Sequence, residues 1–170
     1  MAMRHLAKDV PYRTTYISYG TTKQHIEEML KEAGAIALRW TETPDSMKGV
    51  ALPVLEFILT VELEGVHKEF GIRIQAPLIY DKKRNGHGRP MNAPNRNASM
   101  RLLYWYLKAR LEAVKFGLED ALDAFMSRVI NSLPDGQTPT ISETIRKHPS
   151  ILTQILPSFE IKALPKGDSN

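Results

Sequence analysis

Hydrophobic and polar residues alternate most regularly in VLEFILTVELEGVHKEFGIRIQ, residues 54–75. A two-residue turn at Glu64-Gly65 places Leu63 opposite Val66, because glycine readily adopts a positive φ. Counting outward from this turn puts apolar residues opposite one another on one face: Leu59 and Phe70, Phe57 and Ile72, Leu55 and Ile74. On the other face it pairs Glu56 with Arg73 and Glu62 with His67. A register shifted by one residue would lose both the apolar face and the opposite-charge pairs, so the pattern predicts a β-hairpin with this register.

Alternation also predicts strands at residues 13–19 and 35–42, and helical spacing predicts several helices. The first helix spans 21–34, with Thr21 and Gln24 at capping-box spacing and Gly34 at its end. A long helix spans 98–116, capped by Asn95 or Asn97 and ended by Gly117. Shorter helices are predicted at 118–131, at 141–148 after a capping box of Thr140 and Glu143, and at 151–156 after Ser150.

This order of elements predicts an α+β fold: a small antiparallel sheet of three to four strands, covered by the long helix, with further helices toward the C-terminus. A single domain over residues 13–160 is expected, with loose tails at 1–12 and 161–170. Residues 81–96 are rich in Gly, Pro, Asn and charge, which is typical of a long loop.

Positive charge is concentrated in this loop and the helix after it. Residues 82–110 contain 8 of the 23 Lys and Arg and none of the 19 Asp and Glu, although the whole chain carries only +4. The remainder, with 15 basic and 19 acidic residues, is therefore at −4. A local excess of this kind favours a polyanionic partner, although a solvated basic loop without a partner would give the same pattern.

The long helix carries two faces. Met100, Leu103 and Leu107 follow the spacing of a buried stripe, whereas Arg101, Trp105 and Lys108 form a separate row of two cations around an indole. Such a row suits nucleic acid, since the cations neutralise phosphates and the indole stacks on a base. Alternatively, Trp105 widens the buried stripe and the cations surround it.

Several kinds of chemistry are disfavoured. The chain has no cysteine, which excludes disulfides, thiolate nucleophiles and cysteine-bound zinc. The glycines near His87 lack the spacing of a phosphate-binding loop, and the five histidines lack a metal-ligand spacing on one helix. Glu56, Glu62 and Glu69 point to the polar face of the hairpin, as a metal-dependent nuclease would need. Arg73 and His67, however, are expected to pair with Glu56 and Glu62. We therefore assign no catalytic residue, no metal and no cofactor.

The segment LLYWYLKARLEAVKFGLEDALDAFMSRVINSLPDGQT resembles the helical part of small uncharacterised proteins of bacterial viruses and mobile elements. The shared pattern is a Trp-containing helix, Leu-Glu-Ala, a Gly break, a Phe-rich helix and a Leu-Pro-Asp-Gly turn. The order of elements is also similar to that of single-stranded-DNA-binding domains of the whirly and transcription-coactivator type. The first resemblance implies a genomic setting in which small nucleic-acid-binding accessory proteins are common, and it carries over no catalytic residue. The second is a likeness in the order of elements, and fold alone does not fix function.

The sequence thus predicts a non-enzymatic protein that binds nucleic acid, with single-stranded DNA favoured because no helix-turn-helix pair is evident. Its expected binding residues are Lys82, Lys83, Arg84, Arg89, Arg96, Arg101, Tyr104, Trp105 and Lys108. The alternative is an inhibitor or adaptor whose basic surface meets an acidic protein, and a nuclease is the third candidate. The chain shows neither a signal peptide nor an apolar membrane span, so a cytoplasmic location is expected. A homodimer paired through an edge strand is left open.

Overall fold

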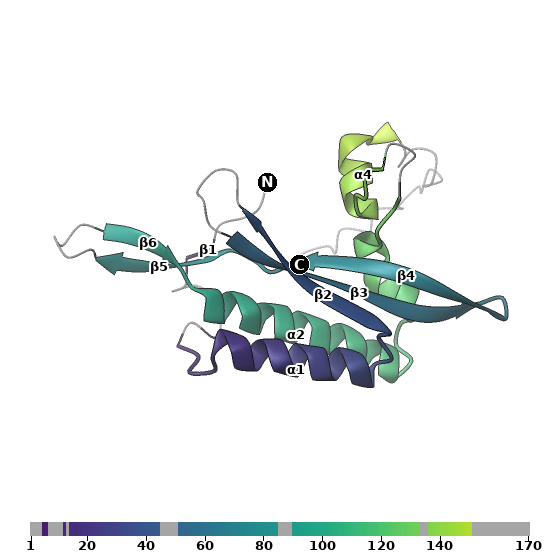
Figure 1. The fold of residues 1–170 in the computed structure, drawn as a ribbon, viewed down its shortest axis with the longest axis horizontal. Helices are drawn as coiled ribbons and strands as arrows, with labels where there is room; N and C mark the ends of the chain where they lie inside the picture. Colours follow the sequence, from purple (N-terminus) through teal and green to yellow (C-terminus); the bar gives the residue numbers. More distant parts are fainter. Residues whose placement is uncertain are drawn as a thin grey trace, which may run out of the picture.

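The computed structural model describes residues 5–6, 12, 14–44, 51–84, 90–132 and 136–150, with the backbone alone at 5–6, 43–44, 82–84 and 90–93. The fold is α+β, as predicted: a three-stranded antiparallel sheet, a second small sheet and four α-helices among the described residues. Two long helices run side by side along one face of the first sheet, and α4 lies on its other side (Figure 1).

The first sheet has the order β2-β3-β4, with β2 at Ala37–Pro44, β3 at Ala51–Leu63 and β4 at Val66–Gln75. Every cross-strand pair predicted for the hairpin is confirmed: Leu63–Val66, Glu62–His67, Leu59–Phe70, Phe57–Ile72, Glu56–Arg73 and Leu55–Ile74. The apolar face built by this register is buried away from the turn, whereas Val66 beside the turn is exposed. The polar face carries Glu56 and Arg73.

The turn that closes this hairpin has a positive φ at both central residues, 52° at Glu64 and 77° at Gly65. This is the type I′ geometry, for which Asn-Gly is the preferred sequence because Asn tolerates the left-handed region better than Glu. We expect Glu64→Asn to raise the free energy of unfolding by about 0.5 kcal/mol, measured by urea denaturation. Gly65→Ala should lower it by about 1 kcal/mol, and an unchanged value for both variants would contradict the turn geometry.

Helix α1 spans Tyr19–Glu32 and begins earlier than predicted. The predicted strand at 13–19 is wrong, because Ser18 caps the helix by accepting a hydrogen bond from the amide of Thr21 at 3.1 Å. The amide of Tyr19 donates at 2.9 Å to the side chain of Asn97, so the start of α1 is fixed by a residue of the long helix. Gly34 has a φ of 87° just past the end of α1, as predicted.

The long helix α2 spans Arg96–Lys115, with Asn95 as its N-cap and Gly117 just past its end at a φ of 71°. Its buried stripe of Met100, Leu103 and Leu107 packs with Ile26 and Leu30 of α1 against the apolar face of the sheet. The same core includes Phe125 of α3, a short helix at Ala121–Phe125.

The helix predicted at 118–131 is shorter than expected. After α3 a 3-10 turn, Met126–Arg128, leads into Val129 and Ile130, which add to the edge of β4. The amide of Ile130 donates to the carbonyl of Gly71 at 2.7 Å. Helix α4 follows at Ile141–Lys147 with the predicted capping box of Thr140 and Glu143. The helix predicted at 151–156 lies outside the described residues.

The predicted loop at 81–96 differs most from the structure. Strand β5, Ile79–Arg84, pairs antiparallel with β6, Pro90–Pro94, and residues 85–89 lie outside the described residues. Strand β1, His5–Leu6, pairs parallel with β5, so part of the predicted N-terminal tail is also in a sheet. This second sheet extends beyond the N-terminal end of α2 (Figure 1).

Candidate functional site

The row predicted on the long helix lies on the face of α2 turned away from the sheet. Met100, Leu103 and Leu107 are buried against the core, and the helical periodicity places Trp105 on the opposite side. Trp105 is exposed, with 37% of its surface accessible. The structure therefore favours an outward-facing indole over the alternative in which Trp105 widens the buried stripe.

Both predicted cations lie against this indole. The guanidinium carbon of Arg101 is 5.5 Å and the Nζ of Lys108 is 5.2 Å from the centre of the Trp105 ring. Contacts of this kind stabilise by cation–π attraction and hold the cations beside the ring. The outer face of α2 thus combines positive charge with an accessible aromatic surface.

Two tyrosines complete the cluster. The ring of Tyr104 meets that of Trp105 edge-on, with centroids 5.3 Å apart and planes at 79°. The ring of Tyr12 stacks on Trp105 at 5.8 Å, with the planes 17° apart. Sequence reasoning assigned Tyr12 to a loose tail, and no local signal could have joined it to Trp105, which is more than ninety residues away in the chain. Its stacking demonstrates that the indole accepts a parallel aromatic ring.

Arg101 is the most unusual member of this cluster, since only 8% of its surface is exposed. Its Nε is buried without a hydrogen-bond partner, and no ion pair links it to any residue of the described part of the chain. Its guanidinium lies 4.6 Å from the centre of the Tyr104 ring. A buried charge without a counter-ion is costly, so Arg101 is a position at which an anion would be stabilised.

The other predicted residues are used differently. Arg96 forms an ion pair with Glu42 of β2 and lies over the Tyr19 ring at 4.8 Å, so it fastens α2 to β2 and α1. Tyr104 is half-buried and packs against the core, which leaves it less accessible than Trp105. Lys108 shares its charge with Glu112, whose carboxylate lies 3.6 Å away.

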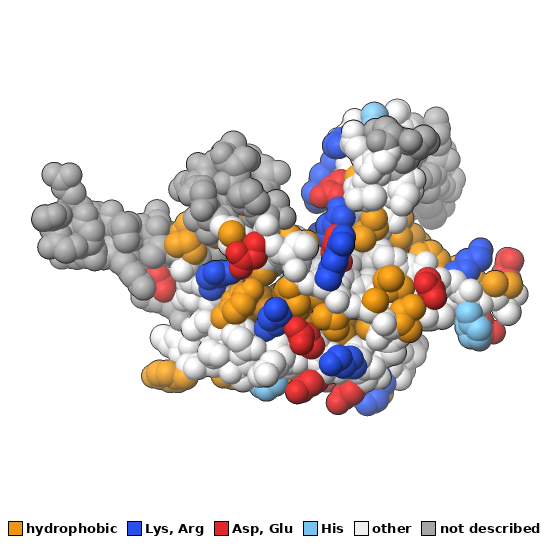
Figure 2. All heavy atoms as spheres, viewed as in Figure 1, with side chains coloured by type: hydrophobic (Ala, Val, Ile, Leu, Met, Phe, Trp, Pro, Cys, Tyr) orange, Lys and Arg blue, Asp and Glu red, His pale blue; other side chains and the backbone are white. Residues whose placement is uncertain are grey.

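Arg96 is the one basic residue of the predicted loop whose side chain the structure describes. Lys82, Lys83 and Arg84 have their backbone in β5, opposite Asn92, Met91 and Pro90, while Arg89 lies outside the described residues. Figure 2 adds a contrast from elsewhere on the surface: over β2 and α1, basic and acidic side chains are interspersed, so no field of a single sign gathers on that face.

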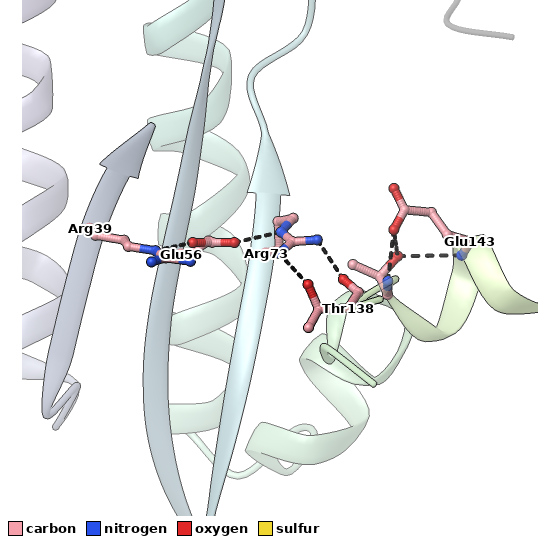
Figure 3. A network of polar contacts seen from close by, with 6 residues as sticks. Arg39, Glu56, Arg73, Thr138 and Glu143 are labelled. Carbon is pink, nitrogen blue, oxygen red and sulfur yellow. Dashed lines mark hydrogen bonds and ion pairs between the residues drawn. The ribbon is translucent and has the colours of Figure 1, made fainter. Parts of the chain in front are cut away.

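The hairpin carboxylates considered for a nuclease do not converge on an open site. Glu56 is buried between Arg39 of β2 and Arg73 of β4, and both of its oxygens accept hydrogen bonds from these guanidinium groups (Figure 3). Burial raises the pKa of Glu56, but the two arginines outweigh burial and hold this pKa below its ordinary value. Within the described ranges, no three His, Asp or Glu side chains are grouped as a metal ion would require.

Comparisons with known proteins supply no relative for this arrangement: no family model matches the chain, and neither the curated proteins nor the solved structures contain a match. In the part of the chain that the structure describes, no helix has both the length and the apolar character needed to cross a membrane.

Proposed function

We propose that this protein binds single-stranded nucleic acid, with DNA favoured, through the outer face of α2, and that it does so without catalysing a reaction. The observation that carries the proposal is Arg101, a buried cation that forms no ion pair with any described residue and lies directly beside the exposed indole of Trp105. A phosphate supplies the missing negative charge, and a neighbouring base stacks with the indole and Tyr12.

A single strand fits this cluster better than a duplex does. Stacking on Trp105 requires an accessible base face, which is covered by neighbouring base pairs inside a duplex. Because Tyr12 already covers one face of the indole, the base either joins this stack on Tyr12 or takes its place. Lys108 beside the ring extends the proposed phosphate contact. Further phosphate contacts are proposed for four basic residues that precede α2 in the sequence: Lys82, Lys83, Arg84 and Arg89.

An acidic protein partner is the second candidate, since a carboxylate would also neutralise Arg101. Binding of an acidic protein, however, does not require an exposed aromatic ring beside Arg101. The 37% exposure of Trp105 therefore favours nucleic acid over an acidic protein surface.

The proposal is tested by fluorescence anisotropy with labelled single-stranded DNA over a range of salt concentrations. We expect Trp105→Ala to weaken binding by about tenfold, the size of one lost base stack. Arg101→Met keeps the apolar stem and removes the charge, so the slope of log K against log salt should become shallower by about 0.7.

Arg110→Met is the matched control, because it makes the same change of charge on the same helix. Arg110 is paired with Glu119 at 3.0 Å and lies away from the Trp105 row, so this variant should bind like the unmodified protein. Absence of binding to any oligonucleotide at low salt would refute the proposed function. Equal effects of the Arg101 and Arg110 substitutions would place the binding site elsewhere.

A further inference from the structure

A groove of about 700 Å³ lies between α1 and α2, beside the cation and aromatic cluster. Its walls are residues of the two helices, and Leu59 and Thr60 of β3 and Ala121 of α3 close its inner end. Sites for small organic molecules have volumes of about 300 to 1,000 Å³, so the groove has room for a ligand of nucleotide size.

The two walls of the groove differ in net charge: the α1 wall is acidic, and the α2 wall has two lysines and one glutamate. The α1 wall carries Glu28 and Glu32, one helical turn apart, and neither forms an ion pair with another described residue. Both side chains are exposed, and like charges at this spacing repel each other, so a ligand that donates hydrogen bonds to both carboxylates would reduce this repulsion. The α2 wall carries Lys108 and Lys115 together with Glu112, whose carboxylate lies 3.6 Å from Lys108, so Lys115 is the cation of this wall without an ion pair to another described residue.

Between these walls the groove is apolar and aromatic. Met29, Leu111 and Val114 line it together with the ring of Tyr104, and the ring of His25 lies 6.3 Å from that of Tyr104. Tyr104 also contacts Trp105 edge-on, and Lys108 lies over the Trp105 ring. The groove and the outer face of α2 are therefore parts of one surface that share two residues.

The geometry points to one unstacked nucleotide of a bound single strand as the occupant, which deepens the proposed function and rests on it. Its base lies on the apolar and aromatic floor, its amino edge donates to Glu28 and Glu32, and its phosphate lies near Lys108 and Lys115. The next phosphate of the strand is then within reach of Arg101. Other small molecules with an apolar body and a single charge would satisfy only one wall.

This arrangement predicts a preference among bases. Cytosine and adenine carry an exocyclic amino donor, whereas thymine presents an oxygen acceptor at the corresponding place, which two carboxylates repel. Oligo-dC and oligo-dA should therefore bind about fivefold more tightly than oligo-dT of equal length. In the Glu28→Ala, Glu32→Ala double variant this difference should fall to within about twofold.

A second variant tests the groove by filling it with a larger side chain. Ala33 is exposed and lines the groove at the end of α1, so Ala33→Trp fills the space without disturbing the core. We expect it to weaken binding of oligo-dC about tenfold and to abolish the base preference. Ala37→Trp, at an exposed position of β2 outside the groove, is the matched control and should leave both unchanged.

The outcomes separate this inference from the proposed function. In one outcome, oligonucleotides bind, Trp105→Ala weakens this binding, and the Ala33 and glutamate variants keep the affinity and base preference of the unmodified protein. The outer face of α2 then binds the strand, and the groove inference is wrong. If no oligonucleotide binds at low salt, both are wrong. Loss of preference in the glutamate variant together with loss of affinity in Ala33→Trp supports both.

Discussion

Replacing Phe125 with alanine is expected to lower the free energy of unfolding by about 4 kcal/mol. Phe125 is fully buried, and its ring meets that of Phe57 edge-on with centroids 5.7 Å apart. Helix α3 has only five residues, too few to be stable alone, so this ring is the main anchor that holds it against β3 and α2. The loss would be a large fraction of the total stability of an ordinary domain.

Urea denaturation of the variant beside Phe116→Ala measures this effect. Phe116 has 74% of its surface exposed just after α2, so the same substitution there should change the free energy of unfolding by less than about 0.5 kcal/mol. A cost below about 1 kcal/mol for Phe125→Ala would contradict the packing of α3 on the core. Because Val129 and Ile130 follow α3 directly, loss of the anchor should also loosen their pairing with β4, measured as faster hydrogen exchange at the Ile130 amide.

The parts of the fold that were predicted correctly are those specified by neighbouring residues. The β3-β4 register follows from one turn and from alternation on either side of it, and both belong to a single stretch of chain. The capping box of Thr140 and Glu143 is equally local, since the two side chains are three residues apart. Here local preference and tertiary structure agree, so pattern alone was sufficient.

The errors occur where a distant partner decides the structure. Residues 13–19 have the composition of a strand, yet Ser18 and Tyr19 begin α1, and the Tyr19 amide is bound by Asn97. The glycines and prolines near residue 90 suggest a loop, but β5 pairs with β6 and with His5–Leu6 from the other end of the described chain. Val129 leaves the predicted helical path because the edge of β4 offers its backbone a partner.

The same division holds for the candidate site. The row of Arg101, Trp105 and Lys108 could be predicted from helical spacing. The stacking of Tyr12 on Trp105 and the groove between α1 and α2 arise only in the folded chain, and the burial of Arg101 is likewise a property of the folded chain. A linear pattern reports which residues share a helix face, but it does not report what lies over that face.

The second large effect is expected at Glu56, whose carboxylate joins the three strands of the first sheet. Arg39 and Arg73 bind it from either side, and Arg73 also donates to the carbonyl of Thr138 at 2.7 Å, ahead of α4 (Figure 3). Glu56→Gln leaves Arg73 without its counter-ion, and we expect the free energy of unfolding at pH 7 to fall by about 2 kcal/mol. This value is below the cost for a fully buried pair, because the Arg39 side chain is largely in solvent.

The stabilisation that the Glu56 ion pairs contribute should be lost toward acidic pH. The pKa of Glu56 is below its ordinary value of about 4.3 in the folded state, because the two arginines outweigh burial. The folded state therefore binds the proton more weakly than the unfolded chain does. The stabilisation is complete above the unfolded pKa and is lost as the pH falls through the folded one. The pKa of Glu143 is also lowered: burial would raise it, but hydrogen bonds from Thr140 outweigh burial, so α4 should weaken over the same acidic range.

Thermal unfolding at pH 7, 5, 4 and 3 distinguishes this account from a general effect of charge. The Glu56→Gln variant should melt about 4 to 8 °C below the unmodified protein at pH 7, and this gap should narrow as the pH falls below the ordinary pKa of a glutamate. Glu69→Gln is the control, because it makes the same change of charge on the same face of the hairpin. Glu69 lies in β4 and is exposed, so this variant should melt within about 1 °C of the unmodified protein at pH 7. A gap at Glu56 as wide at pH 3 as at pH 7 would mean that the glutamine disturbs packing, and that the ion pairs with Arg39 and Arg73 do not hold the three strands together.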